Sequence, residues 1–156
     1  MTTQTTVTKF TAHLIFGFVA GFLATLIFHQ LVRTLIWGLG MVPSAPFSMT
    51  PTKPFGVPAV ISLSFWGGVW GIVFAMLDTK FPRRAGYWLT SFLFGAILPS
   101  LVALLLVLPL KGQPMGGGWN PAQLVIAFIL NGAWGIGTAV FLRMQDSWLN
   151  ASRTVR

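Results

Sequence analysis

The stretch from Gly86 to Leu108, GYWLTSFLFGAILPSLVALLLVL, contains no charged side chain. A helix of this length, at 1.5 Å per residue, covers the roughly 30 Å hydrocarbon core of a bilayer. Three more runs of the same character lie at about 10–28, 57–77 and 121–142. Because backbone amides inside lipid must be hydrogen-bonded within the chain, we expect all four runs to be helices. The sequence predicts an all-α membrane protein with one membrane domain over residues 1–156.

The overall composition supports a membrane protein. Of the 156 residues, 54% are hydrophobic and only 8% are charged, against about 25% charged in a soluble domain. The net charge of +8 comes from basic residues between the apolar runs, without stacking aromatics beside them, so we expect no nucleic-acid partner. The absence of cysteine excludes disulfides, thiolate ligands and cysteine nucleophiles.

The basic residues also predict the orientation. Three of them, Arg33, Lys53 and Lys111, lie on one side of the predicted spans. Seven lie on the other: Lys9, Lys80, Arg83, Arg84, Arg143, Arg153 and Arg156. The positive-inside rule makes the second side cytoplasmic, so we expect a multi-pass protein of a bacterial inner membrane with both termini in the cytoplasm. The first apolar run is longer than a cleavable signal sequence, so we expect it to be retained.

Similar segments recur along the chain. Gly68-Val69-Trp70-Gly71-Ile72 resembles Gly132-Ala133-Trp134-Gly135-Ile136, 64 residues later. Phe16-Gly17 matches Phe94-Gly95 with a shift of 78. The pattern indicates two tandem helical hairpins forming a parallel internal repeat, with a chance match of residues common in membrane helices as the alternative. The larger shift places an extra outer-leaflet segment, 29–42, in the first hairpin.

Small residues at helical spacing mark the expected packing faces. They are Gly17, Gly21, Gly67, Gly71 and Gly135. Between helices in lipid the hydrophobic drive is weak, and close backbone approach at small residues supplies the packing. We expect these glycines to hold the bundle or an oligomer together.

The most polar group beside an apolar run is His29, Gln30 and Arg33. One interpretation is an anion or lipid-headgroup site in the outer leaflet. The favoured one is an interfacial segment whose Arg33 reaches lipid phosphate. Whether 29–42 is helical, interfacial or re-entrant stays open. His13 and His29 are too far apart on one helix to ligate the same metal or haem, and we predict no cofactor.

A second group of polar side chains falls near the middle of the spans: Trp66, Trp70, Asn131 and Trp134. Each indole N–H at that depth needs a partner or a polar cavity. Asn131 is expected to donate an interhelical hydrogen bond, with Ser62 or Ser64 as acceptor. The expected role is structural, with substrate binding as the alternative.

The spans lack the usual catalytic groups: they hold no Asp, Glu or Cys and no His-x-x-x-His pair. We therefore expect a non-enzymatic protein, an accessory or packing subunit that associates with itself or with a larger membrane complex. The alternative is an oligomeric channel or carrier for a small neutral or anionic solute. Quinone or haem binding through one histidine is a third hypothesis.

Several segments together resemble the small, uncharacterised YagU-like membrane proteins of bacteria. They are the residues GFVAGFLAT at 17–25, Gly68-Val69-Trp70-Gly71, Phe94-Gly95 and Leu108-Pro109-Leu110-Lys111-Gly112. The resemblance implies a four-helix inner-membrane protein without an assigned activity. Similar proteins carry a histidine in the second and fourth helices, which this chain lacks, so no metal site is implied.

Overall fold

The computed structural model describes the chain from Thr2 to Thr154, without the side chains of residues 2–6, 9, 146 and 148–154. The expectations for Lys9, Arg153 and Arg156 fall outside the described residues. Four helices are long and apolar enough to cross a membrane: Phe10–Gly38, Ala59–Lys80, Ala85–Leu110 and Pro121–Gln145. The predicted all-α fold with four membrane spans is therefore confirmed.

The described part of the chain forms ten helical elements in sequence order. They are α1 (Thr2–Ala24), η1 (Thr25–His29), α2 (Gln30–Gly38), α3 (Ala59–Leu77), η2 (Asp78–Lys80), α4 (Ala85–Val102), η3 (Ala103–Val107), α5 (Leu108–Leu110), η4 (Met115–Trp119) and α6 (Pro121–Thr154). Two-residue strands, β1 (Pro51–Thr52) and β2 (Val57–Pro58), pair antiparallel before α3. Prolines begin α6 and cap α3, where a missing N–H costs nothing.

The first helix does not end near Phe28, as the sequence predicted. It continues through the π-helical turn η1 into α2 and ends at Gly38. Leu31, Leu35 and Trp37 keep this extension apolar and exposed, so a membrane environment supports it as well as it supports α1. Most of the segment 29–42 is thus a helical continuation of the first span.

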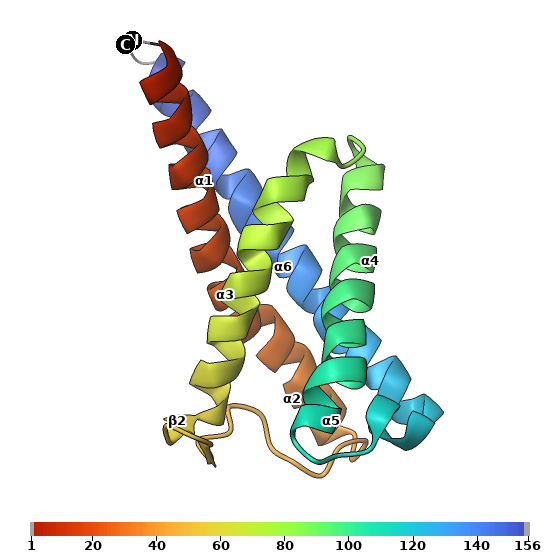
Figure 1. Cartoon of the computed structure of the whole chain (residues 1–156). Helices are drawn as coiled ribbons and strands as arrows, with labels where there is room; N and C mark the ends of the chain where they lie inside the picture. The colour runs from red at the N-terminus through yellow and green to blue at the C-terminus, as the bar shows by residue number, and fades with distance from the viewer. Residues whose placement is uncertain (1, 155–156) are drawn as a thin grey trace.

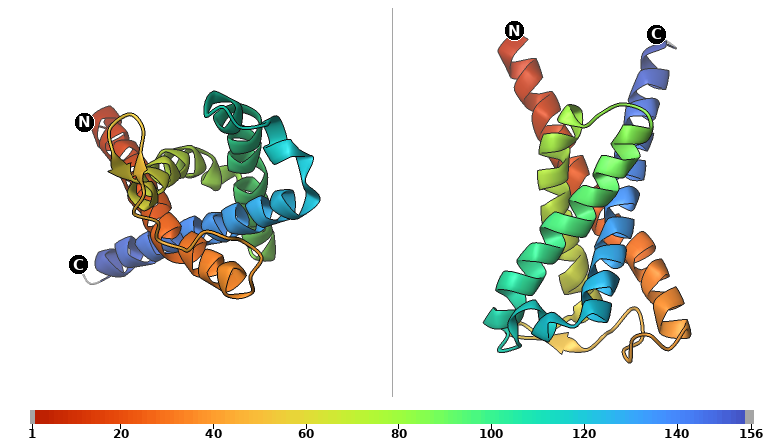
Figure 2. Two further views of the ribbon diagram at one scale, coloured as in Figure 1. Left: turned by 90° about the horizontal axis from the view of Figure 1, so that it is seen from below. Right: turned by 90° about the vertical axis from the view of Figure 1, so that its right-hand side faces the viewer.

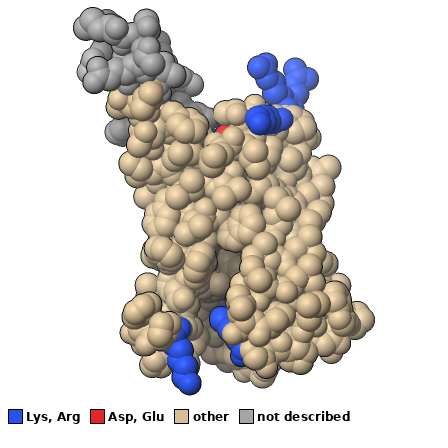
Figure 3. Space-filling model, in the orientation of Figure 1, with Lys and Arg blue, Asp and Glu red and all other residues tan. Residues whose placement is uncertain are grey.

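The two ends of the bundle differ. Figures 1 and 2 place both chain ends, together with the loop between α3 and α4, at one end of the molecule, here called the terminal end. The long connection 39–58 and the shorter one at 111–120 lie at the opposite, loop-rich end. Lys and Arg side chains gather at both ends, and none is seen in the middle of the face that Figure 3 shows.

The bundle is built from two hairpins, α1 with α3 and α4 with α6, joined chiefly where α1 meets α6. Glycines make the contacts within each hairpin. A methyl group on Gly17 would lie 2.7 Å from the Gly71 carbonyl oxygen, and one on Gly21 would lie 2.8 Å from the Gly71 Cα. In the second hairpin, a methyl group on Gly95 would lie 2.9 Å from the Gly135 Cα. Only glycine allows backbones to approach this closely.

Equivalent contacts in the two hairpins occur at matching positions. The Phe18 ring covers Gly68, and the Phe92 ring covers Gly132 in the same way. These pairs keep the shift of 64 for α3 and α6 but give a shift of 74, not 78, for α1 and α4. The alignment of Phe16-Gly17 with Phe94-Gly95 was therefore one helical turn out of register, because backbone contacts and not dipeptide identity set the register.

Aromatic rings fill the space between the hairpins in the inner part of the bundle. Phe74 lies at their centre, with ring centroids 5.1 Å from Phe94, 5.2 Å from Phe81 and 6.3 Å from Trp134. Trp70 packs edge to face on Phe94 at 6.3 Å. Offset and edge-to-face contacts of this kind favour dense packing. This aromatic cluster joins α3, α4 and α6.

Candidate functional site

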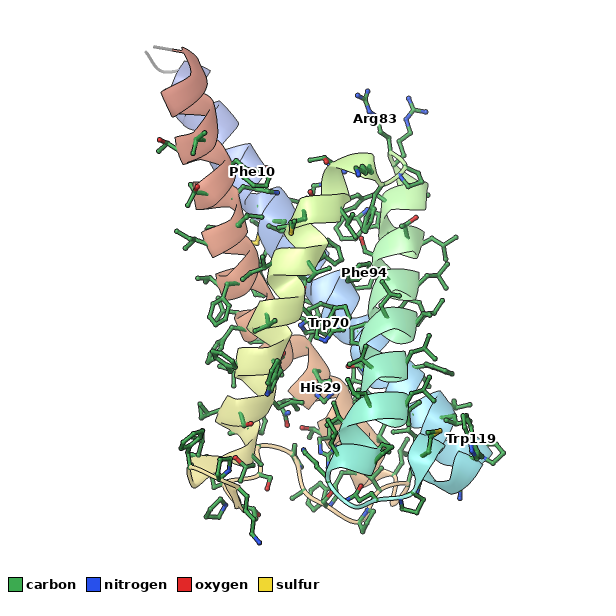
Figure 4. The ribbon with its side chains drawn as sticks, viewed as in Figure 1. Phe10, His29, Trp70, Arg83, Phe94 and Trp119 are labelled. Carbon is green, nitrogen blue, oxygen red and sulfur yellow. The ribbon has the colours of Figure 1, made fainter. Side chains whose placement is uncertain are left out.

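A hollow opens on the side of the molecule toward the loop-rich end. Figure 3 shows it between the two halves of the lower bundle, with Lys and Arg side chains near its lower edge. In the view of Figure 4, His29 is seen in the same region, with the Trp70–Phe94 pair on its inner side. The turn η1, which carries His29, contacts α3 and α6. This lateral hollow, defined by His29, Trp70 and Phe94, opens on the flank of the bundle toward the loop-rich end.

His29 is the most unusual residue of the lateral hollow. It ends the π-helical turn η1 and is only 7% exposed. Its Nδ1 is buried without a hydrogen-bond partner among the described residues. A neutral imidazole carries one donor and one acceptor, and leaving a buried polar atom unbonded costs about 1–3 kcal/mol. Because π-helical turns are frequent at functional sites, His29 is the strongest candidate for a ligand contact.

Gln30 and Arg33 are engaged by the loop that follows α2. The Gln30 Oε1 accepts a hydrogen bond of 2.8 Å from the Phe47 backbone N–H. An Arg33 Nη donates to the Ser44 Oγ at 2.5 Å. The three polar residues predicted as one group therefore divide: Gln30 holds the loop, His29 is unbonded, and Arg33 is partly used. A guanidinium has five N–H donors, so Arg33 retains capacity for an anion.

The four residues predicted as a mid-membrane polar cluster do not converge. Trp134 is 2% exposed, and its Nε1 donates to the Gly21 carbonyl oxygen at 2.9 Å. Asn131 donates to the Ser100 Oγ at 2.9 Å, so its acceptor is neither Ser62 nor Ser64. Trp70 lies in the aromatic cluster, and Trp66 is 58% exposed. Trp134 has its partner on α1, whereas Asn131 and Trp70 have theirs on α4, so the four side chains do not form one site.

Each hairpin also has a polar contact near the terminal end. The His13 Nε2 lies 3.1 Å from the Ala75 carbonyl oxygen and 3.4 Å from the Asp78 Oδ1. In the second hairpin, the Arg143 guanidinium lies 4.1 Å above the Tyr87 ring. His13 is thus a link between α1 and α3, at the opposite end from His29. Within the described residues, no three His, Cys, Asp or Glu side chains form a metal-binding group.

The structure adds contacts that the sequence analysis did not single out. The glycine pair Gly95–Gly135 joins α4 to α6, and Ser100 supplies the acceptor for Asn131. Phe74 organises the aromatic cluster. A signal for Gly95 existed in the Phe94-Gly95 match, but Phe74 and Ser100 are ordinary residues of membrane helices, and only the helix register reveals their roles.

The comparisons with known proteins found no matching family model, curated protein or solved structure.

Proposed function

We propose that this chain is a non-enzymatic accessory subunit of a bacterial inner membrane, assembled with further copies of itself or with a larger membrane complex. The observation that carries this proposal is Trp66. Its side chain is 58% exposed within the span Ala59–Lys80 and packs edge to face on Phe65, itself 50% exposed.

The Trp66 indole N–H has no acceptor among the described residues. Lipid hydrocarbon offers none, so a polar group at that depth is satisfied by protein or at the interface. A neighbouring helix with a free carbonyl or hydroxyl oxygen satisfies it. Exposed Trp and Phe are also typical of interface centres, where large rings bury much area.

The glycine faces are used within the chain, so a partner must contact other faces. Gly17, Gly21, Gly67, Gly71 and Gly135 all contact a neighbouring helix or side chain of the same chain. The faces available to a partner are therefore the exposed aromatic and aliphatic ones, and Trp66 and Phe65 are the largest exposed hydrophobic side chains on α3.

Native mass spectrometry after mild extraction tests the proposal. We expect the wild type to carry further copies or another membrane protein, and Trp66→Phe to lose that association. Trp88→Phe serves as the matched control, because Trp88 is 40% exposed but lies in α4 near the terminal end. A wild type that is always a single chain, or a Trp66→Phe variant that assembles equally well, contradicts the proposal.

The charges support a cytoplasmic location for the terminal end. Lys80, Arg83 and Arg84 are exposed there, between α3 and α4. Arg33, Lys53 and Lys111 belong to the loop-rich end. The excess of basic residues in the sequence favours the terminal end as the inner side, which makes the lateral hollow part of the outer leaflet.

We also propose that the two hairpins are copies of one ancestral hairpin. The contacts of Gly21 with Gly71 and of Gly95 with Gly135 support this origin, as do the interhelical contacts of His13 and Tyr87, which the shift of 74 also makes equivalent. Both copies run in the same direction (Figure 2), as expected for parallel repeats.

A second function, transport of a small neutral or anionic solute, is favoured by the lateral hollow with His29 and Arg33. The aromatic cluster blocks the direct route from the hollow to the terminal end, so transport requires an oligomer or a rearrangement. Solute flux into proteoliposomes that depends on Arg33 supports this alternative against the accessory role.

A further inference from the structure

We propose that the lateral hollow is a binding site for one anionic phospholipid of the outer leaflet, whose phosphate binds Arg33 and whose ester region binds the His29 imidazole. This proposal does not depend on the accessory role.

The side chain that requires a ligand is His29. It is buried to more than nine-tenths, its Nδ1 has no partner among the described residues, and the turn η1 that carries it packs against α3 and α6. A lipid carries ester and hydroxyl oxygens that are free to bond.

The spacing of the polar groups fits a lipid head and its glycerol esters. Arg33 follows His29 by four residues, which on a helix puts it one turn, about 5.4 Å, closer to the loop-rich end. His29, the deeper residue, therefore lies at the level of the lipid's ester groups when Arg33 lies at the level of its phosphate. Further inward, Trp70 and Phe94 offer an apolar wall for an acyl chain.

The charge around the hollow selects an anion. Arg33, Lys53 and Lys111 all belong to the loop-rich end, and Arg33 has N–H groups beyond the one bonded to Ser44. Of the two acidic residues, Asp78 lies at the terminal end beside His13. Asp146 belongs to the part of α6 that runs toward that same end. Guanidinium groups bind phosphate oxygens through parallel hydrogen bonds.

The opening of the hollow points to a lipid and not to a free ion. Figure 3 shows the opening on the flank of the bundle, and in a chain whose four apolar helices cross a bilayer this flank contacts lipid. The loop that follows α2 crosses the loop-rich end (Figure 1) and is held there by the Gln30 and Arg33 side chains. Entry from the membrane is thus more direct than entry from water.

The test uses the full chain in mild detergent, with phosphatidylglycerol, phosphatidylcholine or inorganic phosphate added. Native mass spectrometry counts bound lipids, and the melting temperature reports stabilisation. We expect one tightly held phosphatidylglycerol on the wild type, with phosphatidylcholine held more weakly.

Two variants test the two contacts. His29→Phe keeps a ring but removes both nitrogen atoms, and it is expected to bind phosphatidylglycerol about fivefold more weakly, as the loss of one ordinary hydrogen bond predicts. Arg33→Gln is expected to bind it about tenfold more weakly and to lose the preference over phosphatidylcholine. Lys53→Gln removes the same charge from an exposed position at the same end and is expected to bind like the wild type.

Several outcomes overturn the proposal. They are equal lipid retention by the wild type and both variants, equal weakening by Lys53→Gln, and stabilisation by inorganic phosphate as strong as that by the lipid. If His29→Phe does not fold, Arg33→Gln against Lys53→Gln decides alone. A wild type that binds the lipid but carries no partner chain contradicts the accessory role and leaves the lipid site standing.

Discussion

The indole Nε1 of Trp134 donates a 2.9 Å hydrogen bond to the carbonyl oxygen of Gly21, 113 residues earlier in the chain. The bond joins α6 of the second hairpin to α1 of the first. The same Gly21 also packs against the α3 backbone and accepts a bond from the Thr25 hydroxyl. Three helices therefore meet at one glycine, which makes this bond the main polar link between the two hairpins.

Trp134→Phe should destabilise the bundle while keeping an aromatic ring in the cluster. The variant leaves the Gly21 oxygen without the indole donor, and interhelical bonds in membranes contribute about 0.6–1.7 kcal/mol. Reversible unfolding in mixed detergent micelles measures the loss. Trp88→Phe, at an exposed position, is the control and should unfold like the wild type. Equal stability of the two variants contradicts the linking role.

Gly21→Ala and Gly95→Ala should each destabilise the bundle. At Gly21 and Gly95 the new methyl group meets the neighbouring helix backbone at under 3 Å, so the helices must separate, at a cost of about 1–3 kcal/mol. At Gly38 nothing lies within 4 Å, and alanine should be neutral or stabilising because it favours helix by about 1 kcal/mol. The free energies of unfolding of Gly21→Ala, Gly95→Ala and Gly38→Ala test this expectation. If alanine at position 21 or 95 is as harmless as at 38, the packing described here is wrong.

Asn131 and Ser100 should be energetically coupled. A double-mutant cycle with Asn131→Ala and Ser100→Ala is expected to give about 0.6 kcal/mol, the average for interhelical bonds in membranes. Ser64→Ala provides the comparison, because the Ser64 hydroxyl bonds within its own helix to Val60. The effects of Ser64→Ala and Asn131→Ala should simply add. Coupling for the Ser64 pair but none for the Ser100 pair reverses the assignment.

Much of the architecture could be predicted from the sequence because the bilayer imposes it. Apolar runs such as 86–108 have one stable form in lipid, a helix, and successive spans must cross the bilayer in opposite directions. The small-residue faces could also be predicted, because Gly17 and Gly21 lie four residues apart on one helix, as Gly67 and Gly71 do on another. The continuation of the first helix beyond Phe28 could not be predicted, because His29, Gln30 and Arg33 look like the end of a span until the loop bonded to Gln30 and Arg33 is known.

The contact partners of individual side chains could not be predicted from the sequence. Trp66 and Trp134 have similar sequence surroundings, yet one is exposed and the other is buried against Gly21. The difference arises from the crossing of α1 and α6, which brings a second hairpin to Trp134 and none to Trp66. Ser100 likewise became the acceptor for Asn131 through the register of α4 and α6, which one-dimensional spacing does not determine.

The arrangement of four crossings, with both chain ends in the cytoplasm, is the claim on which the sites and proposals depend. Because the chain has no cysteine, single cysteines can be introduced at Arg83 and Ser147, in the terminal half, and at Lys53 and Lys111, in the loop-rich half. The measurement is labelling of intact cells by a membrane-impermeant maleimide. We predict labelling at 53 and 111 before permeabilisation, and at 83 and 147 only afterwards. Labelling of 53 and 83 from the same side contradicts the account.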